Sequence, residues 1–142
     1  MANRQLFLRA GTTAQLVGRI VDAHLEPVGI PGFLLALLTH VRDQAPVRPT
    51  AVSLASGMPL TTLRDNIQRL VERGLVERVP NPDDGRSYLL VPTRRGIAVA
   101  AAAGEALLEA YVELERLLPR PLRDYELVLE ELNEALTTVA SP

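Results

Sequence analysis

The stretch "NPDDGRSYLLV" at residues 81–91 contains a turn sequence followed by alternating polar and apolar residues. Asp-Gly pairs such as Asp84-Gly85 are common at the turn of a β-hairpin. "LVERV" at 75–79 has the composition of one strand, and "SYLLV" at 87–91 has that of the strand that returns. The sequence therefore predicts a short antiparallel hairpin that carries a basic side chain directly beside its turn.

Two helical segments precede this hairpin. "TAVSLASG" at 50–57 predicts a short helix, with Thr50 as the N-cap and Gly57 as the stop. "PLTTLRDNIQRLVERG" at 59–74 predicts a longer helix, because Pro59 suits a first helical turn. Two short helices joined by a tight turn that contains Gly are typical of a helix-turn-helix.

Further helices are expected on both sides of this unit. Residues 4–24 and 33–44 show helical spacing of apolar residues, and "EPVGIPG" at 26–32 predicts a loop between them. Thr93 is expected to cap a long helix that continues to about Leu118. A last helix carries an apolar seam that suits helix–helix packing. The seam consists of Leu122, Tyr125, Leu129, Leu132, Leu136 and Val139.

The 59–74 helix separates an apolar face from a polar face when it is projected at about 100° per residue. In a helix-turn-helix, the N-terminal part of the second helix contacts base edges in the major groove. The polar residues near the start of this helix are expected there, and the arginines further along are expected at phosphates or bases. The candidate DNA-contacting residues are Thr61, Thr62, Arg64, Asp65, Asn66, Arg69 and Arg73.

Asp65 weighs against this interpretation, because a carboxylate near phosphates repels them. It either accepts a hydrogen bond from a cytosine amino group or pairs with Arg64 or Arg69. The alternative is an ordinary amphipathic helix with a solvated polar face. The order of elements, a helix-turn-helix followed by a basic hairpin, favours DNA binding over that alternative.

The chain resembles the MarR family of bacterial winged-helix transcription regulators along nearly its whole length. The most specific match is Asp84-Gly85-Arg86 followed by Thr93-Arg94-Arg95-Gly96, which is similar to the family's wing signature. "LVERGLVER" at 70–78 and "SLASGM" at 53–58 are similar to neighbouring family segments. The sequence departs from the family at Pro59, where an N-capping Ser is usual, and at Gly85, where a second wing Arg is common.

The resemblance implies a mainly α fold with a small β-hairpin wing, in one domain over residues 1–142. The winged helix-turn-helix would occupy about 33–96, and dimerisation helices would occupy about 4–25 and 97–140. It also implies a homodimer that represses transcription from a palindromic operator in double-stranded DNA. Release by a small aromatic or phenolic effector is a further implication, with His24, Phe33 and His40 as candidate pocket residues.

Arg86 is the strongest candidate among single residues. An Arg at the tip of a wing can enter the minor groove, where narrow A·T tracts concentrate negative potential. Asp84 is expected to orient it. The alternative is an exposed ion pair with Asp83 or Asp84, which contributes about 0–1 kcal/mol.

Charge is distributed unevenly, although the net charge is only −2. Residues 42–95 carry a net +3, and residues 96–142 carry a net −6, which suits contact with protein rather than DNA. Cysteine is absent, which excludes thiol catalysis and thiol oxidation sensing. His24 and His40 are the only histidines and lack the spacing of metal ligands, so neither a metal nor a cofactor is expected.

Other functional classes have little support in the sequence. No glycine-flanked nucleophile and no phosphate-binding glycine loop is present, so an enzyme is not expected. No apolar run reaches the roughly 18 residues that a membrane span needs, and the N-terminus lacks a signal-peptide core, which favours a cytoplasmic protein. The remaining alternative is a winged-helix protein-interaction module without DNA binding. A continuous basic strip over Arg64, Arg69, Arg73 and Arg86 would favour DNA binding, and a broken strip would favour this module.

Overall fold

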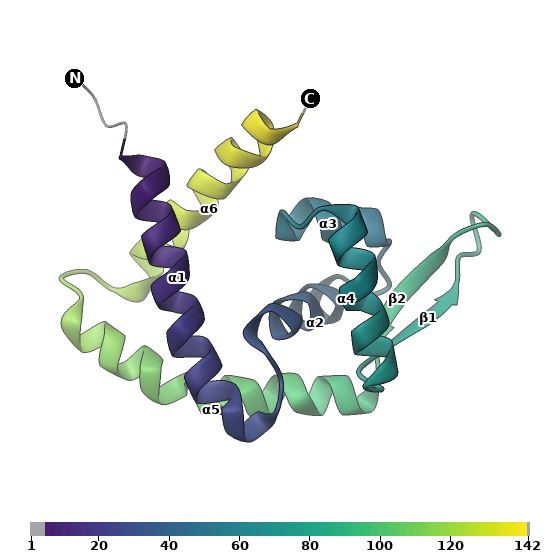
Figure 1. Ribbon diagram of the computed structural model, residues 1–142, viewed down its shortest axis with the longest axis horizontal. Coiled ribbons are helices and arrows are strands. Elements are labelled where there is room, and N and C mark those ends of the chain that lie inside the picture. The colour runs from purple at the N-terminus through teal and green to yellow at the C-terminus, as the bar shows by residue number, and fades with distance from the viewer. Residues whose placement is uncertain (1–4, 142) are drawn as a thin grey trace.

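The computed structural model describes residues 5–141, which form six α-helices, one 3-10 turn and a two-stranded antiparallel sheet (Figure 1). This confirms the predicted fold class, a mainly α chain with one small hairpin. Residue 4, where the first helix was expected to begin, lies outside the described residues. The elements are α1 (Leu6–Leu25), η1 (Glu26–Val28), α2 (Gly32–Gln44), α3 (Pro49–Ser56), α4 (Leu60–Glu72), β1 (Val76–Pro80), β2 (Tyr88–Pro92), α5 (Arg94–Leu117) and α6 (Leu122–Ala140).

The elements group into two parts, which Figure 1 shows at opposite ends of the molecule. The lobe, residues 30–103, contains α2, α3, α4, the hairpin and the first part of α5. The arm consists of residues 6–25 and 104–140, and it contains α1, the rest of α5, and α6. Helix α5 runs through both parts and packs against α2 in the lobe and against α1.

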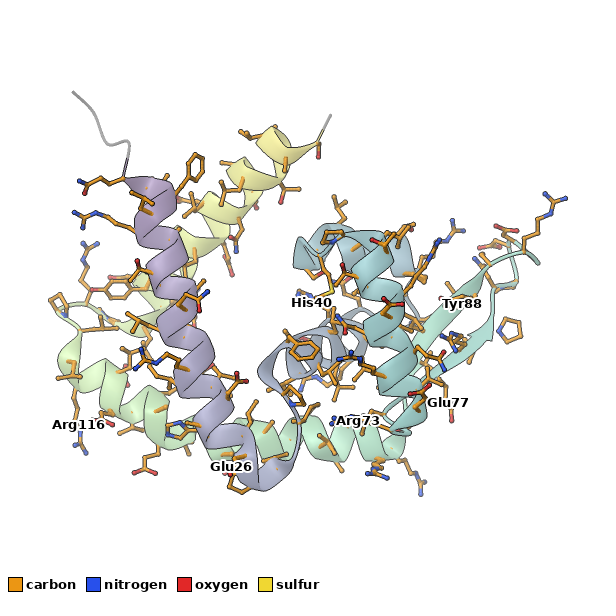
Figure 2. The ribbon with its side chains drawn as sticks, in the orientation of Figure 1. Glu26, His40, Arg73, Glu77, Tyr88 and Arg116 are labelled. Carbon is orange, nitrogen blue, oxygen red and sulfur yellow. The ribbon has the colours of Figure 1, made fainter. Side chains whose placement is uncertain are left out.

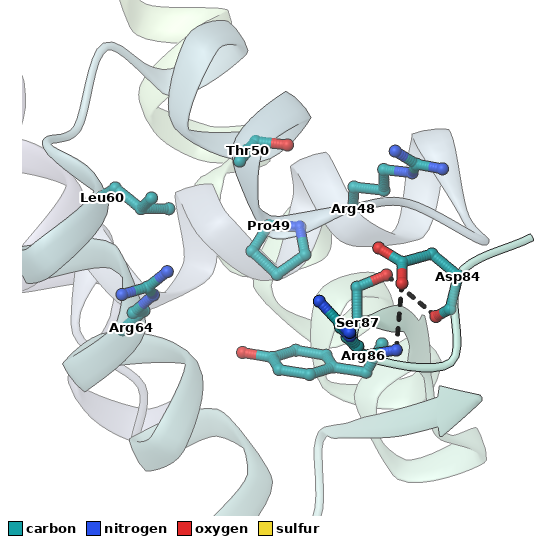
Figure 3. A pocket seen from close by; sticks show the side chains of 9 residues that line it. Arg48, Pro49, Thr50, Leu60, Arg64, Asp84, Arg86 and Ser87 are labelled. Atoms are coloured by element: carbon teal, nitrogen blue, oxygen red, sulfur yellow. Dashed lines mark hydrogen bonds between the residues drawn. The ribbon is translucent and has the colours of Figure 1, made fainter. Parts of the chain in front are cut away.

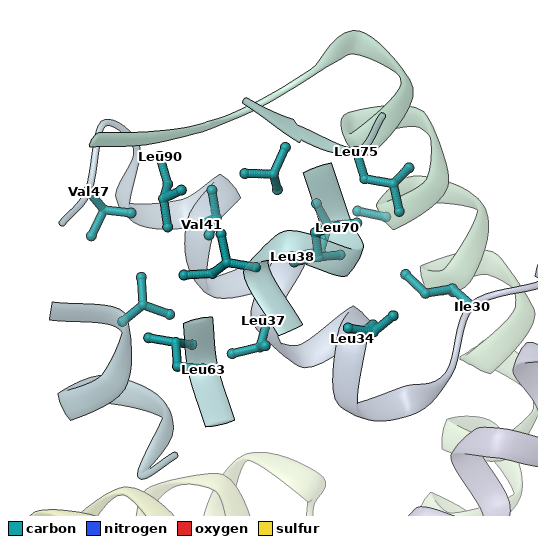
Figure 4. Close-up of a cluster of buried hydrophobic side chains, with 14 of the residues drawn as sticks. Ile30, Leu34, Leu37, Leu38, Val41, Val47, Leu63, Leu70, Leu75 and Leu90 are labelled. Atoms are coloured by element: carbon teal, nitrogen blue, oxygen red, sulfur yellow. The ribbon is translucent and has the colours of Figure 1, made fainter. Parts of the chain in front are cut away.

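The hydrophobic core lies in the lobe (Figure 4). Helix α2 contributes four buried apolar side chains because it is apolar on most sides, as its sequence predicts. Helix α4 adds the apolar face of the predicted amphipathic helix, and the hairpin closes the remaining side. Burying each Leu or Ile fully stabilises the fold by about 1.5–3 kcal/mol. These side chains include Leu34, Leu37, Leu38 and Val41 of α2, Leu63, Ile67 and Leu70 of α4, and Val76 and Leu90 of the hairpin.

The ends of three helices differ from the sequence predictions by a few residues. Thr50 is not an N-cap, because Pro49 already occupies the first turn of α3 and Arg48 precedes it in an extended conformation. Pro59 is the residue before α4 rather than part of it, and it supplies no side-chain cap. The expected loop at 26–32 contains the 3-10 turn η1, and Gly32 is already the first residue of α2.

The hairpin is longer at its tip than an Asp-Gly turn would make it. Pairing ends at Pro80 and Tyr88, so residues 81–87 form a seven-residue connection. Gly85 does not adopt the positive φ that a tight Asp-Gly turn requires. The connection consists of two successive turns, closed by hydrogen bonds from the Asp84 N–H to the Asn81 carbonyl (3.3 Å) and from the Ser87 N–H to the Asp84 carbonyl (3.1 Å).

The start of α5 is fixed tightly to the lobe. The predicted cap is confirmed, since the Thr93 hydroxyl accepts a hydrogen bond from the Gly96 N–H at 2.9 Å. The same hydroxyl donates to the Gly74 carbonyl at 2.6 Å. A Cβ at Gly96 would lie 2.0 Å from the Leu75 carbonyl oxygen, so no larger residue fits without a backbone shift. The cap explains the Thr of the Thr-x-x-Gly part of the wing signature, and the close approach to Leu75 explains its Gly.

Within residues 5–141, no single helix is both long and apolar enough to span a membrane.

Candidate nucleic-acid interface

A groove of about 540 Å³ lies where α3, α4 and the hairpin tip meet (Figure 3). Three arginines from three different elements border it: Arg48 before α3, Arg64 on α4 and Arg86 in the hairpin loop. Asp84 supplies the one carboxylate in the lining, so the lining is net positive. The other lining residues are Pro49, Thr50, Leu60, Ser87 and Tyr88.

The hairpin loop is held by its own side chains. Asn81 is 5% exposed, and its amide donates to the Ser87 hydroxyl at 2.9 Å while its Oδ1 accepts from the Asp83 N–H at 3.0 Å. Asp84 Oδ1 accepts a hydrogen bond from the Arg86 backbone N–H at 3.0 Å. Asn81 therefore acts as a structural residue of the loop that the sequence reading did not single out, although an Asn at a turn position is a common signal.

Arg86 projects from this loop with an exposed side chain. Asp84 binds its backbone and shapes the turn, and within the described chain the Arg86 guanidinium forms no ion pair with Asp83 or Asp84. The alternative in which Arg86 is neutralised by its neighbours is therefore not seen. The guanidinium is left available to an external anion.

Helix α4 presents most of its predicted contact residues to solvent. Thr61, Thr62, Arg64, Asp65 and Arg69 are exposed. Because Pro59 supplies no side-chain cap, the first N–H groups of α4 also lack a side-chain acceptor. The exposed start of this helix therefore combines hydroxyl groups with unoccupied backbone donors.

The placement of Asn66 on that exposed face was wrong. Asn66 is 7% exposed, and its amide donates to the Met58 sulfur at 3.3 Å. Met58 lies in the turn between the two helices, where the Ser53 hydroxyl also donates to its carbonyl at 2.6 Å. Asn66 lies at the margin of the apolar face of α4. Its side chain therefore points inward, where its amide can form a hydrogen bond with the turn that contains Met58.

Arg73 also lies apart from the other arginines. It is the C-cap residue of α4, and its Nη1 donates to the Gly29 carbonyl at 3.1 Å (Figure 2). The side chain is thus bound to the turn that follows η1, at the opposite end of α4 from the groove. The strip over Arg64, Arg69, Arg73 and Arg86 is interrupted at Arg73, and by this criterion the break favours the protein-interaction module. Arg48, which the sequence reading overlooked, joins Arg64 and Arg86 in the groove instead.

The three candidate effector residues are distributed over two helices. His24 is half-buried near the end of α1, with its Nδ1 2.8 Å from the Ile20 carbonyl oxygen. Phe33 on α2 is 45% exposed, and His40 is half-buried on the same helix. A cavity of about 390 Å³ beside the end of α1 is lined by other residues, among them Asp22 and Arg73. Among residues 5–141, no cluster of three metal-ligating side chains is present.

The chain thus has the architecture of a winged helix-turn-helix protein: α3 and α4 form the helix-turn-helix, and the hairpin is the wing. The sequence profile of the MarR family matches residues 34–87, which span α3, α4 and most of the wing. Over these residues the chain is similar to the MarR family. Members of this family are DNA-binding transcription regulators and not enzymes.

Individual relatives show the same similarity. The chain is 32% identical to the multiple antibiotic resistance protein MarR of Escherichia coli K12 over 81 residues, which are 57% of this chain and 56% of that protein. The alignment therefore spans little more than half the length of this relative. The HTH-type transcriptional regulator ML2140 of Mycobacterium leprae is 28% identical over 71% of this chain and 74% of its own length.

Solved structures match over nearly the whole chain. A mutant MarR from E. coli complexed with operator DNA superposes with a TM-score of 0.80 at 25% identity, covering 91% of this chain and 94% of that one. Wild-type apo MarR from E. coli gives a TM-score of 0.75 at 26% identity, covering 99% and 100%. CouR from Rhodococcus jostii bound to p-coumaroyl-CoA shares the fold, with a TM-score of 0.74 at 22% identity and coverage of 98% and 94%.

Proposed function

We propose that this protein is a DNA-binding transcriptional regulator that represses its target genes as a homodimer on a palindromic operator. The observation that carries the proposal is the groove at the wing, where Arg48, Arg64 and Arg86 come together from three elements beside the exposed face of α4. Arginine forms bidentate contacts with phosphate oxygens and with guanine. The likeness to a MarR structure that holds operator DNA supports the same function.

Each part of the interface has a distinct role in this proposal. The start of α4 enters the major groove, where Thr61, Thr62 and Asp65 face base edges. The free N–H groups of its first turn and Arg48 bind phosphates. Arg86 reaches the adjacent minor groove from the wing. Asp65 accepts from a cytosine amino group, which makes it a determinant of sequence choice rather than of affinity.

The arm supports assembly of two copies. Large apolar side chains on α1, the C-terminal part of α5 and α6 are open to solvent in the single chain, and α6 contains no buried residue. Monomeric proteins rarely expose contiguous apolar patches of more than a few hundred Å². Pairing two arms would cover these side chains and would set two recognition helices at a fixed separation, as a palindromic site needs. The most exposed of them include Phe7, Leu8, Leu117, Val128 and Val139.

Binding of a small aromatic or phenolic effector that lowers DNA affinity completes the proposal. His24, Phe33 and His40 line the effector pocket only if the second copy closes over α1 and α2. Titration of the protein–DNA complex with a phenolic acid such as 4-hydroxybenzoate, followed by fluorescence anisotropy, tests this part. Unchanged anisotropy across a panel of phenolic acids would contradict a phenolic effector, and the proposal that the protein binds DNA would still stand.

DNA binding itself is tested on the region upstream of the protein's own gene. Anisotropy with labelled duplexes at about 50 and 200 mM salt should show preference for this region over random DNA, and both affinities should fall as salt rises. Equal affinity for the two duplexes at both salt concentrations would contradict operator recognition. Complete absence of binding would favour the alternative, a winged-helix module that contacts proteins.

A further inference from the structure

Arg78 lies in the middle of β1 and links the wing to the recognition helix. Its Nη2 donates to the Gln68 Oε1 on α4 at 2.8 Å. Its guanidinium carbon lies 5.3 Å from the centre of the Tyr88 ring on β2. Gln68 is fixed in turn, because its Nε2 donates to the Glu72 Oε1 at 2.9 Å. A continuous set of contacts therefore runs from α4 through Arg78 to the second strand of the wing.

The register of the sheet explains why these side chains meet. Arg78 pairs with Leu90, so Tyr88 is its diagonal neighbour on the same face of the hairpin. That face also carries the buried side chains of Val76 and Leu90, and it is therefore the face turned toward the lobe. Arg78 is exposed and lies opposite the buried Leu90, one position on from Val76 along this face of β1 toward the loop.

This position is where the wing needs support. A two-stranded hairpin is at best marginally stable by itself. Val76 and Leu90 anchor its base in the core, whereas Pro80 at the end of β1 is exposed and Tyr88 is half-buried. Tyr88 lines the basic groove and lies two residues from Arg86. A shift of the Arg78 contacts would therefore move the end of the wing that carries Arg86.

We propose that Arg78 is a positioning residue that does not itself contact DNA, and that its bridge between Gln68 and Tyr88 sets the spacing of the wing from the recognition helix. When this spacing is fixed, Arg86 and the exposed face of α4 can contact the same DNA duplex at the same time. This inference rests on the proposed DNA-binding function. Arginine suits the role because its planar guanidinium stacks on an aromatic ring and presents donors in a fixed fork, which lysine does not.

The salt dependence of DNA affinity can show whether Arg78 positions the wing or binds a phosphate itself. Each phosphate contact contributes about 0.9 to the slope of log affinity against log salt. Arg78→Lys keeps the charge but loses the planar fork, and we expect it to bind operator DNA roughly tenfold more weakly with the wild-type slope. Arg86→Gln serves as the reference for a direct contact and should lower the slope by about 0.9 per subunit, or about 1.8 for the homodimer.

The opposite pattern would overturn the inference. If Arg78 bound a phosphate, Arg78→Lys would retain most of the affinity, and Arg78→Gln would lower the slope as Arg86→Gln does. The double variant Gln68→Ala with Arg78→Lys provides a second check. We expect it to bind no more weakly than the weaker of its two single variants, because both remove the same bridge. Additive losses would contradict the bridge.

A measurement without DNA keeps this inference separate from the proposed function. Hydrogen exchange of the free protein should be faster in residues 79–91 of Arg78→Lys than in the wild type, with unchanged protection in α2. Unchanged exchange in the wing would overturn the positioning role even if DNA binds. If the wild-type protein binds no DNA, the proposed function fails, and the exchange result still decides whether Arg78 holds the wing.

Discussion

The lobe and the arm contain similar apolar residues, but these side chains are mostly buried in the lobe and mostly exposed in the arm. In the lobe, Leu38, Leu63 and Ile67 are 0% exposed and belong to one continuous core. In the arm, Leu117 is 76% exposed and Val139 is 80% exposed. The lobe also contains the whole of a segment with net charge +3, residues 42–95, whereas residues 96–142, most of which belong to the arm, carry −6.

This difference in burial and charge assigns DNA contact to the lobe and pairing of two copies to the arm. The lobe buries most of its large apolar side chains in its own core, with Phe33, Leu54 and Ile97 as exposed exceptions, and its outer face carries arginines toward an external anion. The arm leaves its apolar surface unsatisfied, and its acidic charge does not suit DNA. Because the burial of apolar surface is the dominant driving force for association, the arm is the part that we expect to pair with a second copy.

Gly96→Ala should damage the lobe where the arm's long helix begins. The added Cβ would lie 2.0 Å from the Leu75 carbonyl oxygen, so backbone must shift. We expect a loss of about 3 kcal/mol in the free energy of unfolding, measured by urea denaturation. Gly104→Ala is the matched control on the same helix, because nothing lies within 4 Å of its added Cβ. Equal stability of Gly96→Ala and the wild type would contradict the tight junction.

Leu129→Glu should prevent pairing of two arms and leave the fold of the lobe unchanged. Leu129 on α6 is 50% exposed in the single chain, and a charge there would be buried when two arms pair. Light scattering should show monomers, and operator affinity should fall about a hundredfold because the two lobes no longer bind as one unit. Glu130→Gln, at the neighbouring exposed position, is the control and should stay dimeric. A dimeric Leu129→Glu protein would place the interface elsewhere.

Arg86→Ala should weaken DNA binding without affecting either part of the fold. The side chain is exposed and forms no ion pair with Asp83 or Asp84. We expect affinity to fall about tenfold on many sequences, and the salt slope of the homodimer to drop by about 1.8, or about 0.9 for each wing, in anisotropy titrations. Thermal unfolding should be unchanged. Wild-type affinity and slope in this variant would remove the wing from the interface.

Arg73→Ala should have the smallest effect and should act on stability. Its hydrogen bond to the Gly29 carbonyl joins the end of α4 to the turn after η1, where lobe and arm meet. Since the pair is exposed, we expect a loss of about 0.5 kcal/mol in the free energy of unfolding. The salt slope of DNA binding should stay at the wild-type value. A reduced slope would restore Arg73 to the DNA contacts that its sequence position first suggested.

Local signals made much of this structure predictable. The Thr93 cap, the Gly57 stop and the apolar face of α4 depend on residues within one or two helical turns. The same reasoning placed the wing correctly, with strands that leave seven residues between them, but it expected an Asp-Gly turn whose positive φ Gly85 does not adopt. The seven-residue connection depends on Asn81, whose buried amide holds both ends of the loop.

The errors at the site arose from contacts between distant parts of the chain. Arg73 binds a carbonyl 44 residues away, and no pattern within α4 indicates that partner. Asn66 lies at the margin of a helical face, where a projection cannot distinguish an exposed side chain from one bound to Met58. Arg48 joins the groove only because the fold brings α3 beside the wing tip.

Selection of duplexes from a random DNA library by the purified protein tests the division between lobe and arm most directly. If each lobe reads one half-site and the arms pair two lobes, the enriched sequences will form an inverted repeat. The half-site centres should lie about 10–10.5 base pairs apart, or a multiple of that distance. Enrichment of single, asymmetric sites, or of no sequence at all, would contradict the account.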